Sequence, residues 1–183
     1  MANYGLRYPV IAQYDRSTGT YSNGFRCGKA VNVSTTVNYV SGSLSGDDEV
    51  AEQESAFNNV QLTLGTTTLP VAAETVMFGH TVDSETGLVT KAGADVSNYV
   101  GVGVTGVEVV DGVTAYIAKI WTCVKFVEPN DAMTTKGDSI TFSNPSVVGT
   151  GITDYNGTWQ VTKSFTTAAA ALAYINEFLG ITG

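Results

Sequence analysis

The sequence is poor in the residues that catalytic and metal sites most often use. Its 183 residues include one histidine, His80, and two cysteines, Cys27 and Cys123. Any Ser-His-Asp or Cys-His arrangement must therefore use His80, yet no nucleophile stands beside it in the sequence. Neither cysteine belongs to a CxxC motif, which argues against a metal or redox site but leaves a single disulfide open. By elimination, the sequence predicts a structural or binding protein without a cofactor, rather than an enzyme.

Charged residues are also scarce, at 14% of the chain against about a quarter in typical globular proteins. So low a charge content indicates that part of the surface does not permanently face water. The formal net charge of −8 argues against tight nucleic-acid binding, which needs lysine and arginine on phosphates. An acidic surface can still let DNA pass, because it repels the phosphate backbone.

Long hydrophobic runs are missing as well. No apolar stretch is long enough to span a bilayer, and no charged segment followed by an apolar one marks a secretory signal. We therefore expect synthesis in a cytoplasm and no membrane partner.

The longest β-type run covers residues 99–128 and breaks once, at Asp111-Gly112, which is a strong signal for a tight hairpin turn. In the second arm, alternation predicts one core-facing side, made of Tyr116, Ala118, Ile120, Val124 and Phe126. The other side is also apolar, with Val113, Ile117, Trp121 and Val127. We expect Trp121, Ile117 and Val127 to pack against a second sheet or a neighbouring subunit.

The same run contains Gly101, Gly103 and Gly106 in the spacing GxGxxG. That pattern binds dinucleotides only where a strand leads into a helix whose first N–H groups face the pyrophosphate. Here a strand and a hairpin turn follow the glycines, so they are better explained by a bend or bulge.

The rest of the chain predicts one domain over residues 1–183, mainly β, with a sandwich or barrel-like architecture. Strands are expected within 6–15, 31–39, 59–64, 140–145 and 158–165, and a turn or small hairpin over 83–91. Pro70 opens a short helix that stops at Gly79, and His80 lies just past its end. A C-terminal helix is predicted over 166–180, capped by Thr166 or Thr167 and ended by Gly180.

A polar segment rich in glycine and serine, residues 41–56, is predicted to be an extended loop. It carries five carboxylates, those of Asp47, Asp48, Glu49, Glu52 and Glu54. The segment lacks the alternating oxygen ligands and the bend glycine of a Ca²⁺ loop, so we interpret it as a solvated acidic run.

Several segments in order resemble the major tail proteins, or tail tube proteins, of bacteriophages with long non-contractile tails. They are TGTYSNG (18–24), GKAV (28–31), DDEVAE (47–52), LGTTTL (64–69), MFGHTVD (77–83), EPNDAMTTKGDSITFSNPSVVGTG (128–151) and NGTWQV (156–161). Together they span about residues 5 to 163, and the terminal helix lies outside the pattern.

This resemblance implies a β-sandwich with a flanking helix that closes into hexameric rings, which stack as a hollow tail tube in the virion. It implies that the tube forms around a tape measure protein, ends at tail tip and tail terminator proteins, and later conducts double-stranded DNA. Assembly would take place in the host cytoplasm. In that family the segment matching 41–56 reaches toward neighbouring subunits.

A second class of protein is compatible with the same composition. A non-polymerising binding module, such as a virion decoration protein or a carbohydrate-binding β-sandwich, would be a monomer or small closed oligomer with a concave aromatic patch. A tube protein would instead form rings or filaments as its concentration rises.

Overall fold

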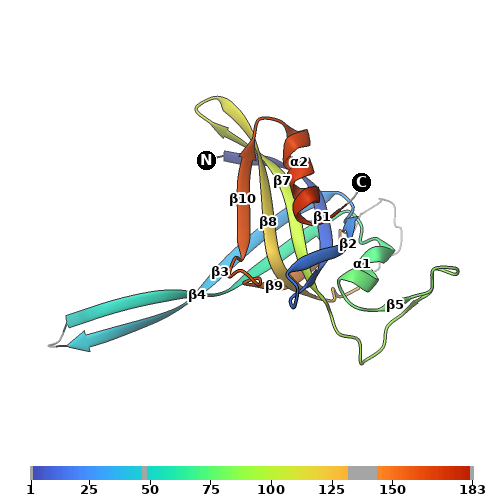
Figure 1. Cartoon of the computed structure of the whole chain (residues 1–183), viewed down its shortest axis with the longest axis horizontal. Coiled ribbons are helices and arrows are strands. Elements are labelled where there is room, and N and C mark those ends of the chain that lie inside the picture. The colour runs from blue at the N-terminus through green and yellow to red at the C-terminus, as the bar shows by residue number, and fades with distance from the viewer. Residues whose placement is uncertain (1, 47–48, 132–143, 182–183) are drawn as a thin grey trace, which may run out of the picture.

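A computed structural model describes residues 2–46, 49–131 and 144–181 and shows a mainly β protein with two helices (Figure 1). The strands are β1 (Ala2–Asp15), β2 (Thr20–Arg26), β3 (Ala30–Gly46), β4 (Glu49–Thr66), β5 (Thr81–Val82), β6 (Val89–Thr90), β7 (Tyr99–Val110), β8 (Val113–Val127), β9 (Ser146–Ile152) and β10 (Gln160–Phe165). The helices are α1 (Val71–Val76) and α2 (Ala168–Phe178). The predicted fold class, a β-sandwich-like protein with a short C-terminal helix, is confirmed.

Eight of the strands form one antiparallel sheet in the order β2-β1-β7-β8-β9-β4-β3, and β10 branches from β8. The sheet curls until β1 approaches β3, so that its two halves face each other across a core. Strand β8 lies at the centre of this arrangement. Its first half pairs with β10 and its second half with β9, both along the edge opposite β7.

The switch between these partners falls at Thr122, where β8 contains one extra residue. Val102 lies opposite Trp121 and Val100 opposite Val124. One residue of β7 between these pairs therefore faces two residues of β8. Thr122 is fully buried, and its polar groups are all bonded. Its N–H and hydroxyl donate to the carbonyls of Trp159 and Thr158, and its own carbonyl accepts from the Tyr21 hydroxyl.

This bulge corrects the face assignment made from the sequence. Ala118 and Ile120 do share a face, which packs under α2. Val124 and Phe126 lie instead with Trp121, in the core between the two halves of the sheet. A single extra residue reverses the alternation, because successive side chains of a strand point to opposite faces.

The main core lies inside the curled sheet and is closed at one end by α1. It draws fully buried aliphatic side chains from opposite strands, among them Ile11, Val60, Leu62, Val100 and Val102. Ala73, Val76, Met77 and Phe78 add the buried face of α1 and the turn after it. The helix ends at Val76, earlier than the predicted stop, and Gly79 has the predicted positive φ at the end of the turn that follows.

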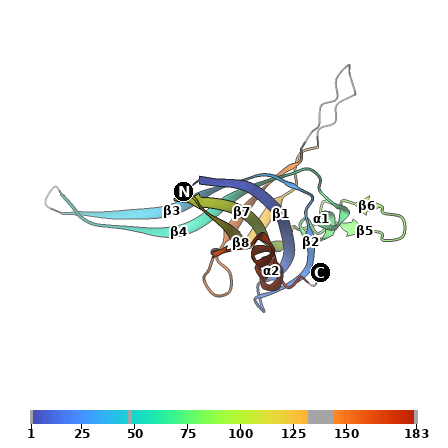
Figure 2. The ribbon, with the colours of Figure 1, turned by 90° about the horizontal axis from the view of Figure 1, so that it is seen from above.

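Helix α2 packs on the outside of the sheet, over β1, β7 and β8 (Figure 2). Thr167 caps it by accepting a hydrogen bond from the Ala170 N–H, within the predicted 166–180 boundaries. A methyl group added at Gly103 would overlap the Ile175 side chain, and one at Gly101 would overlap Tyr21 and Leu179. The first two glycines of the GxGxxG spacing, Gly101 and Gly103, therefore let the helix pack closely on β7.

The hairpins at Asp111-Gly112 and over residues 81–90 are confirmed. The strands predicted within 6–15, 31–39, 59–64 and 158–165 correspond to β1, β3, β4 and β10, and β1, β3 and β4 are longer than predicted. Strands β2 and β9 were missed. β2 shows no clear apolar period, and two of the three buried positions of β9 are glycines, Gly149 and Gly151. The predicted start of a strand at Ile140 and Phe142 lies outside the described residues.

No helix in the described part of the chain combines the length and the apolar character needed to cross a membrane. The two cysteines, which the sequence left open as a disulfide, are free thiols, and both are fully buried.

The seating of α2 on β7 can be tested with a matched pair of glycine substitutions. Gly103→Ala should lower the free energy of unfolding by about 1–3 kcal/mol, because the methyl group overpacks the helix contact. Gly106→Ala, in the same strand with open space beside it, should be neutral or slightly stabilising. Urea denaturation measures both, and equal effects of the two substitutions would show that α2 does not pack closely on Gly103.

The thiols should be chemically inert in the native protein. Burial raises the pKa of both Cys27 and Cys123 to about 11, so the reactive thiolate is scarce at neutral pH. Iodoacetamide should therefore modify neither residue in the folded chain and both after denaturation, as read by mass spectrometry. Modification of the native chain as fast as that of a model thiol would contradict this burial.

Candidate functional site

The outer half of the β3–β4 hairpin extends away from the body as an arm (Figures 1 and 2). Strand β4 also pairs with β9, but only from Val60 to Gly65. Beyond this point β3 and β4 pair with each other alone, as far as Gly46 opposite Glu49. We call residues 38–59 of this hairpin the projecting arm.

The prediction of a loop over 41–56 is therefore wrong for the described residues, because 41–46 continue β3 and 49–56 belong to β4. The segment shows no apolar alternation, so its sequence is typical of a loop. Its pairing is fixed instead by the buried base of the hairpin, where Val33 lies opposite Leu64 and Val37 opposite Val60. Once that register is set, the polar residues farther out continue the same ladder.

Three aromatic rings fasten the arm to the body. Tyr39 meets Phe57 edge-on, with ring centroids 6.4 Å apart. Phe57 stacks on Trp159, which precedes β10, at 5.2 Å and an interplanar angle of 10°. Such offset aromatic pairs add about 0.5–1.5 kcal/mol each beyond the area they bury.

The two faces of the arm differ in chemistry. By alternation along the paired strands, Val40, Leu44, Glu52 and Glu54 share one face. The opposite face carries uncharged polar side chains, those of Ser41, Ser43, Gln53 and Ser55. Val40 and Leu44 are 60% and 65% exposed, and Tyr39 at the base is 61% exposed.

Of the five predicted arm carboxylates, Glu52 and Glu54 are exposed on this aliphatic and acidic face. Glu49 opens β4, paired with Gly46. Asp47 and Asp48 lie outside the described residues. Glu52 and Glu54 thus give the described part of the arm a negative charge.

The three predicted packing residues separate in the structure. Trp121 and Ile117 are buried, and both line a groove of about 460 Å³ between the N-terminal half of β1, β3 and β8. Trp121 also joins the main core between the two halves of the sheet. Val127 is 70% exposed at the end of β8.

A second, smaller groove was not predicted from the sequence. It is lined by Leu6, Arg7, Tyr8, Arg26, Lys29 and Ala30. Arg7, Arg26 and Lys29 are exposed, and the Arg26 guanidinium lies over the Tyr8 ring, 4.4 Å from its centroid. We call this feature the basic groove. These cations come from two parts of the sequence, Arg7 in β1 and Arg26 with Lys29 at and after the end of β2, and the pairing of β1 with β2 brings them together.

His80 is buried and bonded through Nδ1 to Asp95, rather than held by the end of the short helix alone. The sequence suggested no partner for it, because Asp95 follows 15 residues later in an irregular segment.

Comparison with protein-family models finds no family that matches this chain, and comparison with curated proteins finds no relative.

Proposed function

We propose that this chain is a structural virion protein that assembles into stacked hexameric rings and forms the tail tube of a bacteriophage. The observation that carries the proposal is the projecting arm, on which Tyr39, Val40 and Leu44 are 61%, 60% and 65% exposed. The hexamer, the tube and the virion come from the resemblance in sequence. The arm supplies a physical reason for self-assembly.

An isolated two-stranded ribbon is only marginally stable in water, and the arm has no third strand. Full burial of a side chain such as Val40 or Leu44 gains about 1.5–3 kcal/mol. A neighbouring copy that covers the aliphatic and acidic face would supply this burial, and the free edge of β3 could pair as well.

The basic groove offers the arm a complementary surface on another copy. Glu52 and Glu54 share their face with the exposed aliphatic residues, and the basic groove combines three cations with the ring of Tyr8. Because arm and groove are different surfaces, a contact between them is head-to-tail, and such contacts close into rings or continue as filaments.

Charge also fits the proposed partners. With a net charge of −8 per subunit, a stacked tube would carry a dense negative field. An acidic lumen would let double-stranded DNA slide through, because its wall has no sites that bind the phosphates tightly. The same proposal includes a tape measure protein inside the tube and tail tip and tail terminator proteins at its ends. It includes no enzymatic activity and no cofactor.

The competing class, a non-polymerising virion decoration or carbohydrate-binding module, calls for an exposed aromatic patch in a concave surface. The larger groove contains Tyr4 and Trp121, but Trp121 is only 2% exposed. In the described residues that groove therefore offers one accessible ring, which does not favour a stacking platform for sugars.

Removing the end of the arm tests the proposal directly. Residues 41–55 can be replaced by Asn-Gly, because Val40 lies opposite Ala56 and a two-residue turn can join them. The shortened chain should keep its free energy of unfolding within about 1 kcal/mol, since the deleted residues add nothing to the core. It should remain monomeric where the full chain forms rings or filaments by electron microscopy. Tubes formed without the arm would refute its role in assembly.

A charge exchange tests which surface receives the arm. Glu52→Lys with Glu54→Lys, or Arg7→Glu with Arg26→Glu, should each weaken assembly, because like charges then face each other. All four substitutions together should restore it, as measured by light scattering against concentration. Lys163→Glu, outside the groove, serves as the control. If neither pair has an effect while arm deletion blocks assembly, the arm binds elsewhere on the neighbour.

A further inference from the structure

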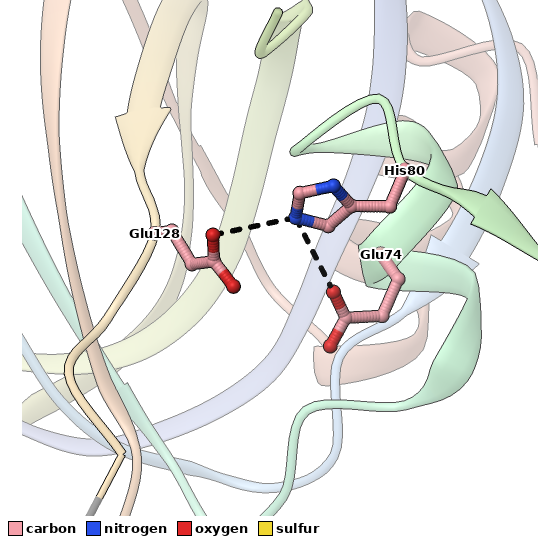
Figure 3. A group of neighbouring side chains, drawn as sticks. All are labelled: Glu74, His80 and Glu128. Atoms are coloured by element: carbon pink, nitrogen blue, oxygen red, sulfur yellow. Dashed lines mark ion pairs between the residues drawn. The ribbon is translucent and has the colours of Figure 1, made fainter. Parts of the chain in front are cut away.

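Ionisable side chains from two separate parts of the sequence meet near α1, at the end of β8. Glu74 comes from α1, His80 follows the turn after that helix, and Glu128 directly follows β8. Figure 3 shows the two carboxylates on the same side of the imidazole, both directed at Nε2.

The distances among these groups suit ligands of a single metal ion. Nε2 of His80 lies 3.4 Å from Oε2 of Glu128 and 3.8 Å from Oε2 of Glu74. One ligand atom from each residue lies within 4.8 Å of the others. Bonds of about 2.0–2.1 Å in a tetrahedral zinc site separate its ligand atoms by about 3.4 Å. Small side-chain rotations would therefore complete the geometry.

The imidazole leaves one nitrogen unused. The His80 side chain is only 5% exposed, and its Nε2 has no hydrogen-bond partner among the described residues. Oε2 of Glu74 is likewise buried without a hydrogen-bond partner there, and its ion pair with Nζ of Lys91 is 3.5 Å long. A charge-assisted hydrogen bond would bring nitrogen and oxygen to about 2.7–2.9 Å, well below either distance measured here. Both ion-pair separations are therefore longer than a hydrogen bond, and they suit a cation placed between the ligand atoms.

Asp95 holds the ring in the orientation that a metal ligand needs. Its Oδ2 lies 2.8 Å from Nδ1 of His80 and also accepts the Ala92 N–H at 2.8 Å. These two hydrogen bonds, the backbone one first, lower the pKa of Asp95. A carboxylate on Nδ1 places the proton there and leaves Nε2 free to bind, the arrangement common to metal-bound histidines.

The cluster also carries excess negative charge. Lys91 bonds Oε1 of Glu128, the oxygen that faces away from His80, and lies 3.5 Å from Glu74. Its hydrogen bond lowers the pKa of Glu128. Three carboxylates against one ammonium leave two negative charges when the imidazole is neutral, which a divalent cation would balance.

We propose that Glu74, His80 and Glu128 bind one divalent transition-metal ion, with Zn²⁺ as the best fit. An imidazole with two carboxylates suits Zn²⁺, whereas Mg²⁺ and Ca²⁺ prefer oxygen ligands alone. The bound ion would tie α1 and the irregular segment after it to the end of β8. It would leave at least one coordination position for water, because Glu128 is 42% exposed.

Isothermal titration of Zn²⁺ into the full chain, after dialysis against a chelator, tests the site. One ion should bind per chain, far more tightly than Mg²⁺ or Ca²⁺, and should raise the melting temperature. His80→Gln should lower the Zn²⁺ affinity more than 100-fold. Asp95→Asn, which changes only the residue that positions the ring, should lower it about 10–100-fold with unchanged stoichiometry.

Glu85→Gln provides the control, since Glu85 lies in the same irregular segment, is exposed, and forms no part of the cluster. It should bind Zn²⁺ as the unmodified chain does. If the His80→Gln variant folds poorly, Glu128→Gln tests the same site, because it removes a different proposed ligand. If the unmodified chain does not bind Zn²⁺, or if the His80, Glu128 and Glu85 variants bind it equally, the proposed metal site is wrong. The cluster is then an ion-pair network only. The outcome is independent of whether the chain forms tubes.

Discussion

The extra residue in β8 at Thr122 is the constraint on which the rest of this fold depends. Strand β8 pairs with β7 on one edge, and on the other it must change from β10 to β9. The bulge makes that change and also exchanges the two faces of the strand. Residues before it pack under α2, and residues after it pack in the main core. A buried threonine suits the position because all its polar groups are bonded, and an unpaired one would cost about 1–3 kcal/mol.

The projecting arm follows from this division of the sheet. Strand β9 pairs with the second half of β8 on one edge and with β4 on the other, but with β4 only from Val60 to Gly65. Farther out, among the described residues, β3 and β4 pair with each other and with no third strand. The arm is paired strand to strand yet buries little of itself, and the contacts among Tyr39, Phe57 and Trp159 fix where it leaves the body. This combination is suited to contacts with other copies of the chain.

Electrostatics organises the surface in a similar way. The chain has few charges, and its cations are unevenly distributed. Three of them line the basic groove, and Lys91 forms ion pairs with the carboxylates beside His80. The arm displays Glu52 and Glu54 instead. Segregation of this kind favours association in one orientation, because like charges meet in the alternatives.

The sequence by itself determined the mainly β class, the Asp111-Gly112 hairpin, the short helix closed by Gly79 and the C-terminal helix capped by Thr167, since each has a local signal. It did not determine features that depend on distant partners. The bulge at Thr122 has no local mark, so alternation misassigned Val124 and Phe126. The arm resembles a loop because its register is set by buried residues farther down the hairpin. Only the tertiary structure brings Glu74, His80, Asp95 and Glu128 together, since only the first two are close in the sequence, and the segments of Asp95 and Glu128 must first pack beside them.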